Sequence, residues 1–278
     1  MRALGHTAVV TSALPGVAWP AVPGADGARR LALQYQFSQS EQWTPQQLHE
    51  AQFSQLTSLL RHAQATSPFY HERLSGLPAQ GPISAAAFAQ IPLLQRTEIQ
   101  DNFDGLCSRA VPADHGRVQE GQTSGSTGRP IRFLHTEVTA EFWRAFTLRE
   151  HLWHRRDFSA RLGSIRSRVS EISSPGWGDA TDGVFSTGDA TMFNTMRPLH
   201  EQAEWLMQEN PEYLISVASN LSGLAQYCGE HGLRPSRLRE VRTYGEALHP
   251  DARATVRAAW DAPLVDIYSC SEAGYLAL

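Results

Sequence analysis

The segment that decides the fold is residues 213–267, YLISVASNLSGLAQYCGEHGLRPSRLREVRTYGEALHPDARATVRAAWDAPLVDI. Its first five residues, Tyr213–Val217, form an apolar run that predicts a buried strand, and Leu264–Ile267 at its far end predicts another. Glu240–Thr243 predicts a third, shorter strand between these two. The stretches that separate the three strands are long enough for helices, so the segment predicts alternating strands and helices.

Two helical patterns fill the stretches between these strands. Ser219 is placed to cap a helix that runs to about Gly232. Its apolar residues recur at helical spacing and are Leu221, Leu224, Ala225 and Cys228. Pro250–Trp260 predicts the second helix, with the proline in its first turn. Strands joined through helices pair in parallel with right-handed crossovers, which predicts an α/β fold with parallel or mixed sheets flanked by helices.

Two segments of unusual composition follow the second and third predicted strands. They are Tyr244–Ala247 (YGEA) and Tyr268–Glu272 (YSCSE). Ligands bind beyond the carboxyl ends of the strands in open sheets of this kind. We therefore expect both segments at one rim of the sheet, where they form a candidate binding site.

The first half of the chain contains one well-defined helix signal. Thr44 is followed by Pro45 and, three positions on, by Gln47, which together form a capping-box pattern with proline at the first helical position. Leucines recur at helical spacing down to about residue 65, and Ser67-Pro68 ends the helix because the residue before proline avoids helical angles. Residues 1–33 are rich in Ala, Gly, Pro and Val without periodicity, which predicts a loosely ordered tail.

Composition restricts the function. The 278 residues include 24 basic and 28 acidic side chains, for a formal net charge of −4, which argues against a general binder of nucleic acids or membrane surfaces. All the basic residues are arginine, so Schiff-base chemistry on a lysine of this chain is excluded. Three widely separated cysteines predict neither a disulfide framework nor a zinc cluster. Prolines interrupt the N-terminal apolar residues and no run is long enough to span a membrane, so we expect a cytoplasmic protein.

The segment Gln122–Pro130 (QTSGSTGRP) carries the strongest chemical signal. Its glycines allow backbone N–H groups to approach a ligand closely, and its hydroxyls add donors, so it suits a loop that wraps a polyphosphate. A flexible Ser/Gly linker is the alternative, although a linker has no reason to lead directly into the apolar strand predicted at Ile131–Leu134. The segment lacks the lysine of a Walker loop and the spacing of a dinucleotide-binding fingerprint or a nucleophile elbow.

Thr123–Pro130 resembles the phosphate-loop signature of the adenylate-forming superfamily, which comprises acyl-CoA ligases, adenylation domains and luciferases. Within it the chain is most similar to the phenylacetate–CoA ligase and capsule-biosynthesis branch. Stretches that follow the order of this branch are Ser67–Tyr70, Ile91–Leu94 with Arg96, Pro211–Leu214, Ser219–Leu221, Tyr244–Leu248 and Tyr268–Gly274. The likeness runs from about Gln34 to the end, which implies that residues 34–278 form the N-terminal portion of an adenylate-forming domain.

The resemblance assigns roles to individual residues. The residues that would hold the β- and γ-phosphates of ATP are Ser124, Gly125, Ser126, Thr127 and Gly128. Those that would line the adenine are Gly245, Glu246 and Ala247, with Tyr268 stacked on it. Ser271 would contact the α-phosphate and Glu272 would ligate Mg²⁺, so the implied catalytic residues are Thr127, Ser271 and Glu272. The resemblance gives no role to single residues of Trp177–Met196, which we expect to contribute to an acid pocket.

The reaction implied by the resemblance is the ATP-dependent activation of a carboxylic acid, expected to be aromatic, to an acyl-adenylate. The acyl group would then pass to a thiol, either coenzyme A or the thiol of a carrier protein. The expected partners are therefore small molecules, with neither nucleic acid nor membrane among them, and the oligomeric state is left open.

Three departures from the family pattern bear on activity. Arg129 stands where the family has a lysine, and Ser269 stands where it has a glycine after the adenine-stacking tyrosine. The family's ribose-binding aspartate, hinge and C-terminal domain with its adenylating lysine would lie beyond Leu278, so we expect that lid domain to be absent from this chain. The alternative function is a nucleotide-binding module, or an incomplete fragment, without adenylating activity.

Overall fold

In a computed structural model, which describes residues 8–123, 128–167 and 169–277, the chain divides into two compact units. One unit combines residues up to Gln34 with Trp143–Leu278, and the other is Tyr35–Phe142. The first unit contains the segment that alternates strands and helices. Among the described residues, no helix has both the length and the apolar character that a membrane span requires.

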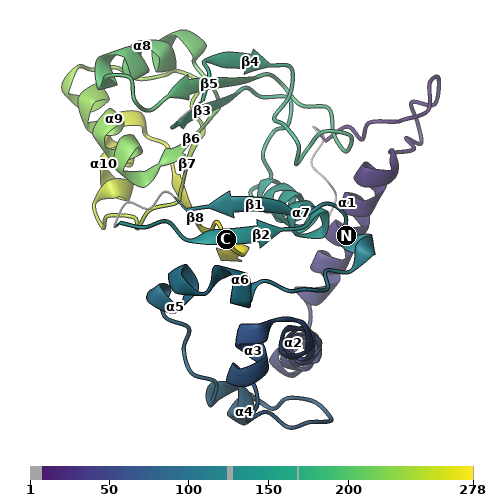
Figure 1. The fold of residues 1–278 in the computed structure, drawn as a ribbon. Helices are drawn as coiled ribbons and strands as arrows, with labels where there is room; N and C mark the ends of the chain where they lie inside the picture. The colour runs from purple at the N-terminus through teal and green to yellow at the C-terminus, as the bar shows by residue number, and fades with distance from the viewer. Residues whose placement is uncertain (1–7, 124–127, 168, 278) are drawn as a thin grey trace. The chain divides into compact units, whose positions relative to one another are not determined.

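The larger unit is built on a seven-stranded sheet in the order β4-β5-β3-β6-β7-β8-β9 (Figure 1). The strands are β3 (Leu162–Arg166), β4 (Ile172–Ser174), β5 (Ala190–Asn194), β6 (Tyr213–Val217), β7 (Glu240–Tyr244), β8 (Leu264–Cys270) and β9 (Gly274–Ala277). The five central strands are parallel, whereas β4 and β9 at the two edges are antiparallel to their neighbours. The predicted α/β class is therefore confirmed.

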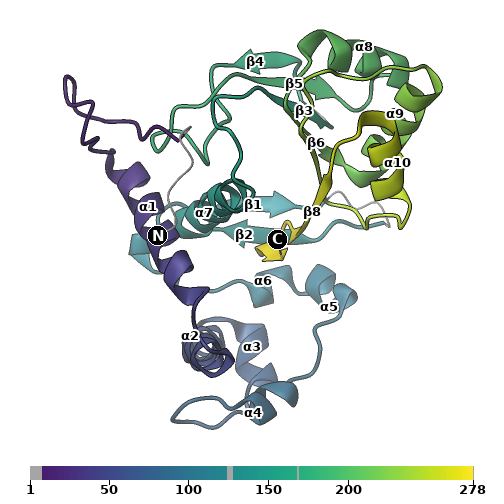
Figure 2. The same ribbon diagram turned by 180° about the vertical axis from the view of Figure 1, so that it is seen from behind.

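Three helices lie together on one face of this sheet, as both views show (Figures 1 and 2). They are α8 (Leu199–Glu209), α9 (Ala218–Glu230) and α10 (Ala252–Trp260). Because side chains alternate along a strand, Leu214 and Val241 point to these helices and are fully buried there. The predicted inner face of α9 is confirmed, since Leu221, Leu224 and Cys228 are also fully buried.

The boundaries of α9, α10 and β8 differ from the prediction. Helix α9 begins at Ala218 with Val217 at the N-cap, so Ser219 lies in the first turn and does not cap the helix. Helix α10 begins at Ala252, so Pro250 precedes the helix and is not in its first turn. Strand β8 continues three residues past Ile267, because β9 folds back to pair with its end. These shifts arise from tertiary pairing that local patterns do not encode.

The opposite face of the sheet carries a second core, which includes Tyr213, Ile215 and Ile267. Helix α7 (Glu137–Trp153) contacts β9, where the Thr147 hydroxyl lies 3.1 Å from the Tyr275 hydroxyl. The N-terminal part of the chain differs from the loosely ordered tail that we expected. It contains helix α1 (Ala25–Ser40), and Val10 forms a β-bridge with Phe185. The predicted extent of the domain, residues 34–278, stays a prediction.

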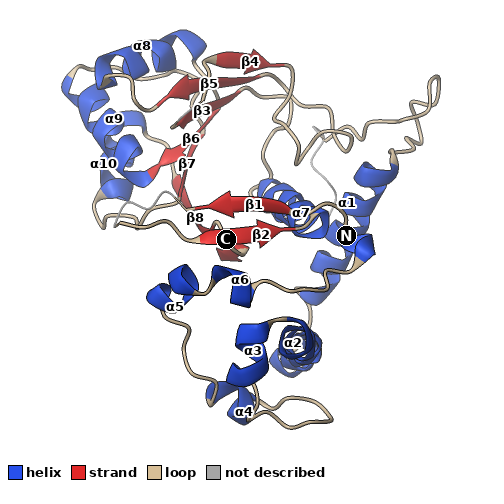
Figure 3. Ribbon diagram, viewed as in Figure 1, coloured by secondary structure: helices blue, strands red, loops and turns tan. Residues whose placement is uncertain are grey.

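The unit Tyr35–Phe142 contains one long helix, α2, several short helices and a β-hairpin (Figure 3). Its helices are α2 (Pro45–Thr66), α3 (Pro68–Arg73), α4 (Ala85–Ala89), α5 (Arg96–Asp101), α6 (Phe103–Leu106) and the single 3₁₀ turn Ala113–His115. The predicted capping box is confirmed, because the Thr44 hydroxyl accepts from the Gln47 backbone and the Gln47 side chain accepts from the Thr44 backbone. The hairpin strands are β1 (Gln119–Gln122) and β2 (Arg132–His135), the latter one residue later than predicted.

Candidate functional site

The two segments predicted to form a binding site lie at the carboxyl ends of neighbouring strands. Tyr244, the last residue of β7, pairs with Ile267 of β8, so Gly245 and Tyr268 leave this pair in the same direction. The second segment is not a loop as a whole, because Tyr268–Cys270 belong to β8 and only Ser271–Ala273 form the turn to β9. A register shift lies between Tyr268 and Ser269.

The segment after β7 has a specific backbone requirement. Gly245 has φ +77°, a left-handed conformation that residues with a side chain rarely adopt. Glu246 follows, and one of its carboxylate oxygens accepts a hydrogen bond of 2.7 Å from the Ser219 backbone N–H. That N–H belongs to the first turn of α9, where it has no partner within the helix. The Glu246 side chain therefore caps α9 and ties the loop after β7 to the end of β6, while Ala247 is exposed.

The segment after β8 presents accessible side chains. Tyr268 is 65% exposed, which leaves its ring open to stacking. Ser271 and Glu272 are exposed in the turn. A free carboxylate of this kind fits a hard cation such as Mg²⁺. In the described ranges, no three His, Cys, Asp or Glu side chains gather as a metal cluster.

The predicted phosphate loop belongs to the unit Tyr35–Phe142. Ser124, Gly125, Ser126 and Thr127 lie outside the described residues. Their flanks are paired, because the Thr123 N–H donates to the Ile131 carbonyl over 2.9 Å and the Ile131 N–H donates to the Thr123 hydroxyl over 3.0 Å. The segment therefore stands between the two strands of a hairpin, which disfavours the flexible Ser/Gly linker that composition alone left open.

The residues that end this loop have defined surroundings. Gly128 has φ +127°, and no heavy atom lies within 4 Å of the position a Cβ would take. The guanidinium of Arg129 pairs with Asp101 over 2.6 Å, and both side chains are more than half exposed. The pair is therefore exposed to water and of low strength, so Asp101 leaves Arg129 able to exchange partners.

A buried ionic cluster, not anticipated from the sequence, connects α7 to β7. It consists of Glu150, Arg156, Glu240 and Arg242, of which Glu150 is fully buried and the arginines are 3% exposed. Arg156 donates to Glu150 over 2.5 Å and to Glu240 over 2.6 Å, and Arg242 donates to the second oxygen of Glu150. His151 accepts from Arg156 over 3.1 Å. The two carboxylates balance the two guanidinium groups, and the cluster fixes the strand that leads to Gly245.

The protonation of this cluster follows from its surroundings. Burial opposes ionisation of Glu150, yet Arg242 and Arg156 outweigh it and hold the pKa of that carboxyl below its ordinary value. Burial lowers the pKa of His151 well below 6.5, and the nearby arginines lower it further. His151 is therefore neutral in the folded protein at pH 7, which fits a ring nitrogen that accepts from Arg156.

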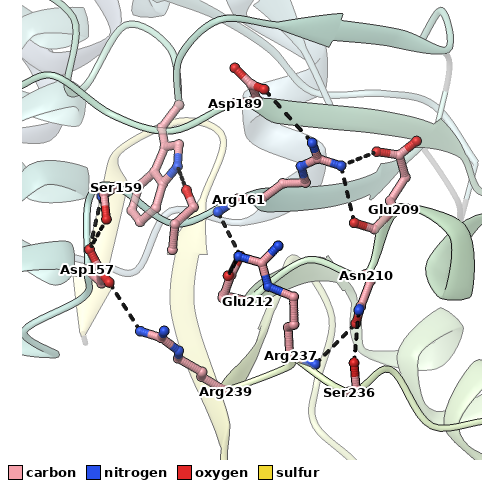
Figure 4. A network of polar contacts seen from close by, with 12 residues as sticks. Asp157, Ser159, Arg161, Asp189, Glu209, Asn210, Glu212, Ser236, Arg237 and Arg239 are labelled. Atoms are coloured by element: carbon pink, nitrogen blue, oxygen red, sulfur yellow. Dashed lines mark hydrogen bonds and ion pairs between the residues drawn. The ribbon is translucent and has the colours of Figure 1, made fainter.

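A second polar network lies at the opposite, amino end of the parallel strands (Figure 4). Glu212, 2% exposed, precedes β6 and accepts from the Arg161 backbone N–H over 2.9 Å, and it pairs with Arg237. Arg239, which precedes β7, pairs with Asp157 over 3.2 Å. Because ligands bind at the carboxyl ends of such strands, we interpret this network as structural.

The aromatic residues expected in an acid pocket are mostly core residues. Phe185 stacks on Phe158 with ring centroids 5.0 Å apart and is 3% exposed. Phe193 stacks on Trp205 at 5.3 Å beneath α8. Trp177 donates its indole N–H to the Ala160 carbonyl over 2.9 Å. The aromatic composition of this stretch reflects packing on both faces of the sheet, which the sequence did not distinguish from a pocket wall.

Solved structures resemble this chain, although no protein-family profile and no curated protein matches its sequence. A 2-hydroxyisobutyryl-CoA ligase with 2-HIB-AMP and CoA in the thioesterification state aligns with a TM-score of 0.59 at 19% identity over 82% of this chain. The fold is shared with CoA ligases. An open conformation of such a ligase gives a TM-score of 0.56 at 17% identity over 80% of this chain. These alignments cover 50% and 49% of the ligase chains, so this chain spans about half their length.

Proposed function

We propose that this chain is the nucleotide- and acid-binding part of an enzyme that activates a carboxylic acid with ATP to an acyl-adenylate. The acyl group then passes to a thiol such as that of coenzyme A. The observation that carries the proposal is the pair of segments after β7 and β8 at one sheet edge, in a fold shared with CoA ligases. The phenylacetate–CoA ligase branch and an aromatic acid remain part of the proposal, supported by the order of the sequence motifs.

The roles proposed for the residues follow from their chemistry. The acid's carboxylate attacks the α-phosphorus of ATP, and pyrophosphate leaves. Hydroxyl and N–H donors of Ser124–Gly128 would hold the outer phosphates, and the Gly245–Ala247 backbone and Tyr268 would hold the adenine. Ser271 would donate to the α-phosphate and Glu272 would hold Mg²⁺. The ion, when bound, supplies Lewis-acid stabilisation of phosphate charge.

Glu246 takes a different role in this proposal from the one that the resemblance implies. Its carboxylate is already engaged by the Ser219 N–H, so the side chain positions the adenine loop while the backbone at Gly245 and Ala247 faces the base. The left-handed angle at Gly245 supports this, because it turns the chain sharply at the end of β7.

A measurement of ATP–pyrophosphate exchange tests the proposal, with nucleotide binding followed in parallel. We expect exchange that depends on one member of a panel of aryl acids. The second candidate is a module that binds nucleotide without adenylating an acid. Nucleotide binding without exchange would select this module for the chain as given, whereas failure to bind ATP or AMP would refute both functions.

The loop is tested by the double replacement of Ser126 and Thr127 by alanine. The two hydroxyls are assigned to the outer phosphates, so affinity for ATP should fall more than affinity for AMP. Each hydrogen bond to a charged oxygen contributes about 1.5–3 kcal/mol. Equal losses for ATP and AMP would show that the loop does not hold the outer phosphates.

A further inference from the structure

Arg166 is held in an unusual way at the carboxyl end of β3. Its Nε donates to the hydroxyl of Ser164 over 2.7 Å, and Ser164 is only 5% exposed. Its guanidinium lies over the ring of Tyr244, with Cζ 5.2 Å from the ring centroid. That distance is within the range of a cation–π interaction. The side chain is exposed, yet it is fixed on one edge by Ser164 and on one face by Tyr244.

Strand register places this guanidinium at the candidate site. Ser164 pairs with Ile215, so Arg166 lies level with Val217, and Val217 pairs with Tyr244. The side chain therefore reaches across the end of β6 to the residue that directly precedes Gly245. Helix α9 begins at Ala218 on the same edge, but the Glu246 carboxylate already accepts from the Ser219 N–H in its first turn. The positive charge that this edge offers a ligand is therefore that of Arg166.

Arg166 differs from the other arginines near the strand ends because no carboxylate in the described part of the chain pairs with it. Arg197, which follows β5, pairs with Glu171 and Glu201 at 3.1 Å each. Arg161, Arg237 and Arg239 at the amino ends also pair with carboxylates. With its Nε anchored by Ser164 and one face on a ring, Arg166 presents its two terminal nitrogens in the planar geometry that a carboxylate accepts.

We propose that Arg166 binds the carboxylate of the acid substrate, with Tyr244 as the platform that orients it. The inference rests on the proposed function, because it names the group that holds the acid in that reaction. The attacking carboxylate must approach a nucleotide of the same sign of charge, and a cation beside it offsets that repulsion. Arg166, held by Ser164 and Tyr244 at this sheet edge, supplies such a cation.

The test compares acids with their neutral amides on the full chain. Benzoate, phenylacetate, acetate and 2-hydroxyisobutyrate are titrated by calorimetry against the protein, with and without AMP, next to the corresponding amides. We expect the parent to bind at least one acid more tightly than its amide. Arg166→Gln should lose about tenfold or more of that acid affinity and bind the amide as before, because it removes a charge-assisted pair. Arg166→Lys should fall between the two, since it keeps the charge and loses the planar fork.

Two variants serve as matched controls. Arg197→Gln removes an exposed arginine that is already paired, so acid affinity should not change. Tyr244→Phe keeps the ring and should retain binding, whereas Tyr244→Leu should weaken it. Urea unfolding of each variant shows whether it is folded; should Arg166→Gln be unfolded, the decision rests on Arg166→Lys.

Three outcomes would overturn the inference. One is equal acid affinity in Arg166→Gln and the parent, and another is a parent that binds no acid better than its amide. In the third, Arg166→Gln keeps its preference for the acid over the amide and instead loses the preference for AMP over adenosine, which would assign Arg166 to a phosphate. The proposed function fails separately, when the parent binds neither ATP nor AMP, and acid binding through Arg166 can be measured even then.

Discussion

Replacement of Glu150 by glutamine should destabilise the larger unit severely. Glu150 is fully buried, and its two oxygens accept from Arg156 and Arg242. Arg242 already has an Nε without a hydrogen-bond partner, and Glu150 is its only carboxylate in the described residues. The amide keeps the shape of the side chain and removes the charge, so the cluster is left with one uncompensated buried cation.

The expected cost is about 3–5 kcal/mol, the range found when one partner of a buried ion pair is removed. With a denaturant dependence of about 3 kcal/mol per molar urea, the unfolding midpoint should fall by about 1–1.7 M. Tryptophan fluorescence is a suitable probe, because six of the seven tryptophans lie in the larger unit and only Trp43 lies in Tyr35–Phe142.

A matched control and a double variant make this test specific. Glu120→Gln makes the same chemical change in a pair with Arg132 that is about half exposed on both sides, and it should leave the midpoint nearly unchanged. Glu150→Met with Arg242→Met removes both charges and should recover much of the loss, since apolar pairs of similar volume often replace buried ion pairs without penalty. The reasoning is wrong if Glu150→Gln shifts the midpoint no more than Glu120→Gln, or if the double variant loses the sum of the two single variants.

Three further predictions follow from the same sites. The folded-state pKa of His151 lies well below 6.5, so the unfolded chain binds more protons than the folded one under acid conditions. The free energy of unfolding should therefore fall as the pH drops below about 6.5, by up to about 1.4 kcal/mol per pH unit. Urea titrations across that pH range should show a smaller slope for His151→Gln. Glu246→Ala removes the cap on the Ser219 N–H, so it should lower the free energy of unfolding by about 1 kcal/mol and weaken adenosine binding. Glu246→Gln keeps an acceptor and should retain most of the stability and of the adenosine affinity. An alanine variant with the parent's unfolding curve would contradict the capping role. Glu272→Gln should lower ATP affinity chiefly in the presence of Mg²⁺ and leave adenosine binding unchanged. A variant that loses adenosine binding, or that has a lower melting temperature than the parent, would show that Glu272 stabilises the turn instead.

Much of the fold could be predicted from sequence because its signals are local. The apolar run Tyr213–Val217 is buried on both faces of a parallel sheet, so it appears as a continuous hydrophobic stretch. The capping box at Thr44 is a contact between residues three positions apart. Helix starts were less certain, as at α9, because Glu246 supplies the cap from 27 positions away.

The sequence by itself determined the alternation of strands and helices, the chemical character of the loops and the absence of lysine. Only the tertiary structure decided which charged residues are buried together, and that Arg166 has no carboxylate partner among the described residues. Glu150 and Arg242 are 92 positions apart, and Arg166 and Tyr244 meet only because β3 and β7 flank β6. Charges on a helix or strand look the same in sequence whether they face water or one another. Strand order and register set those distances, and they depend on packing across the whole sheet.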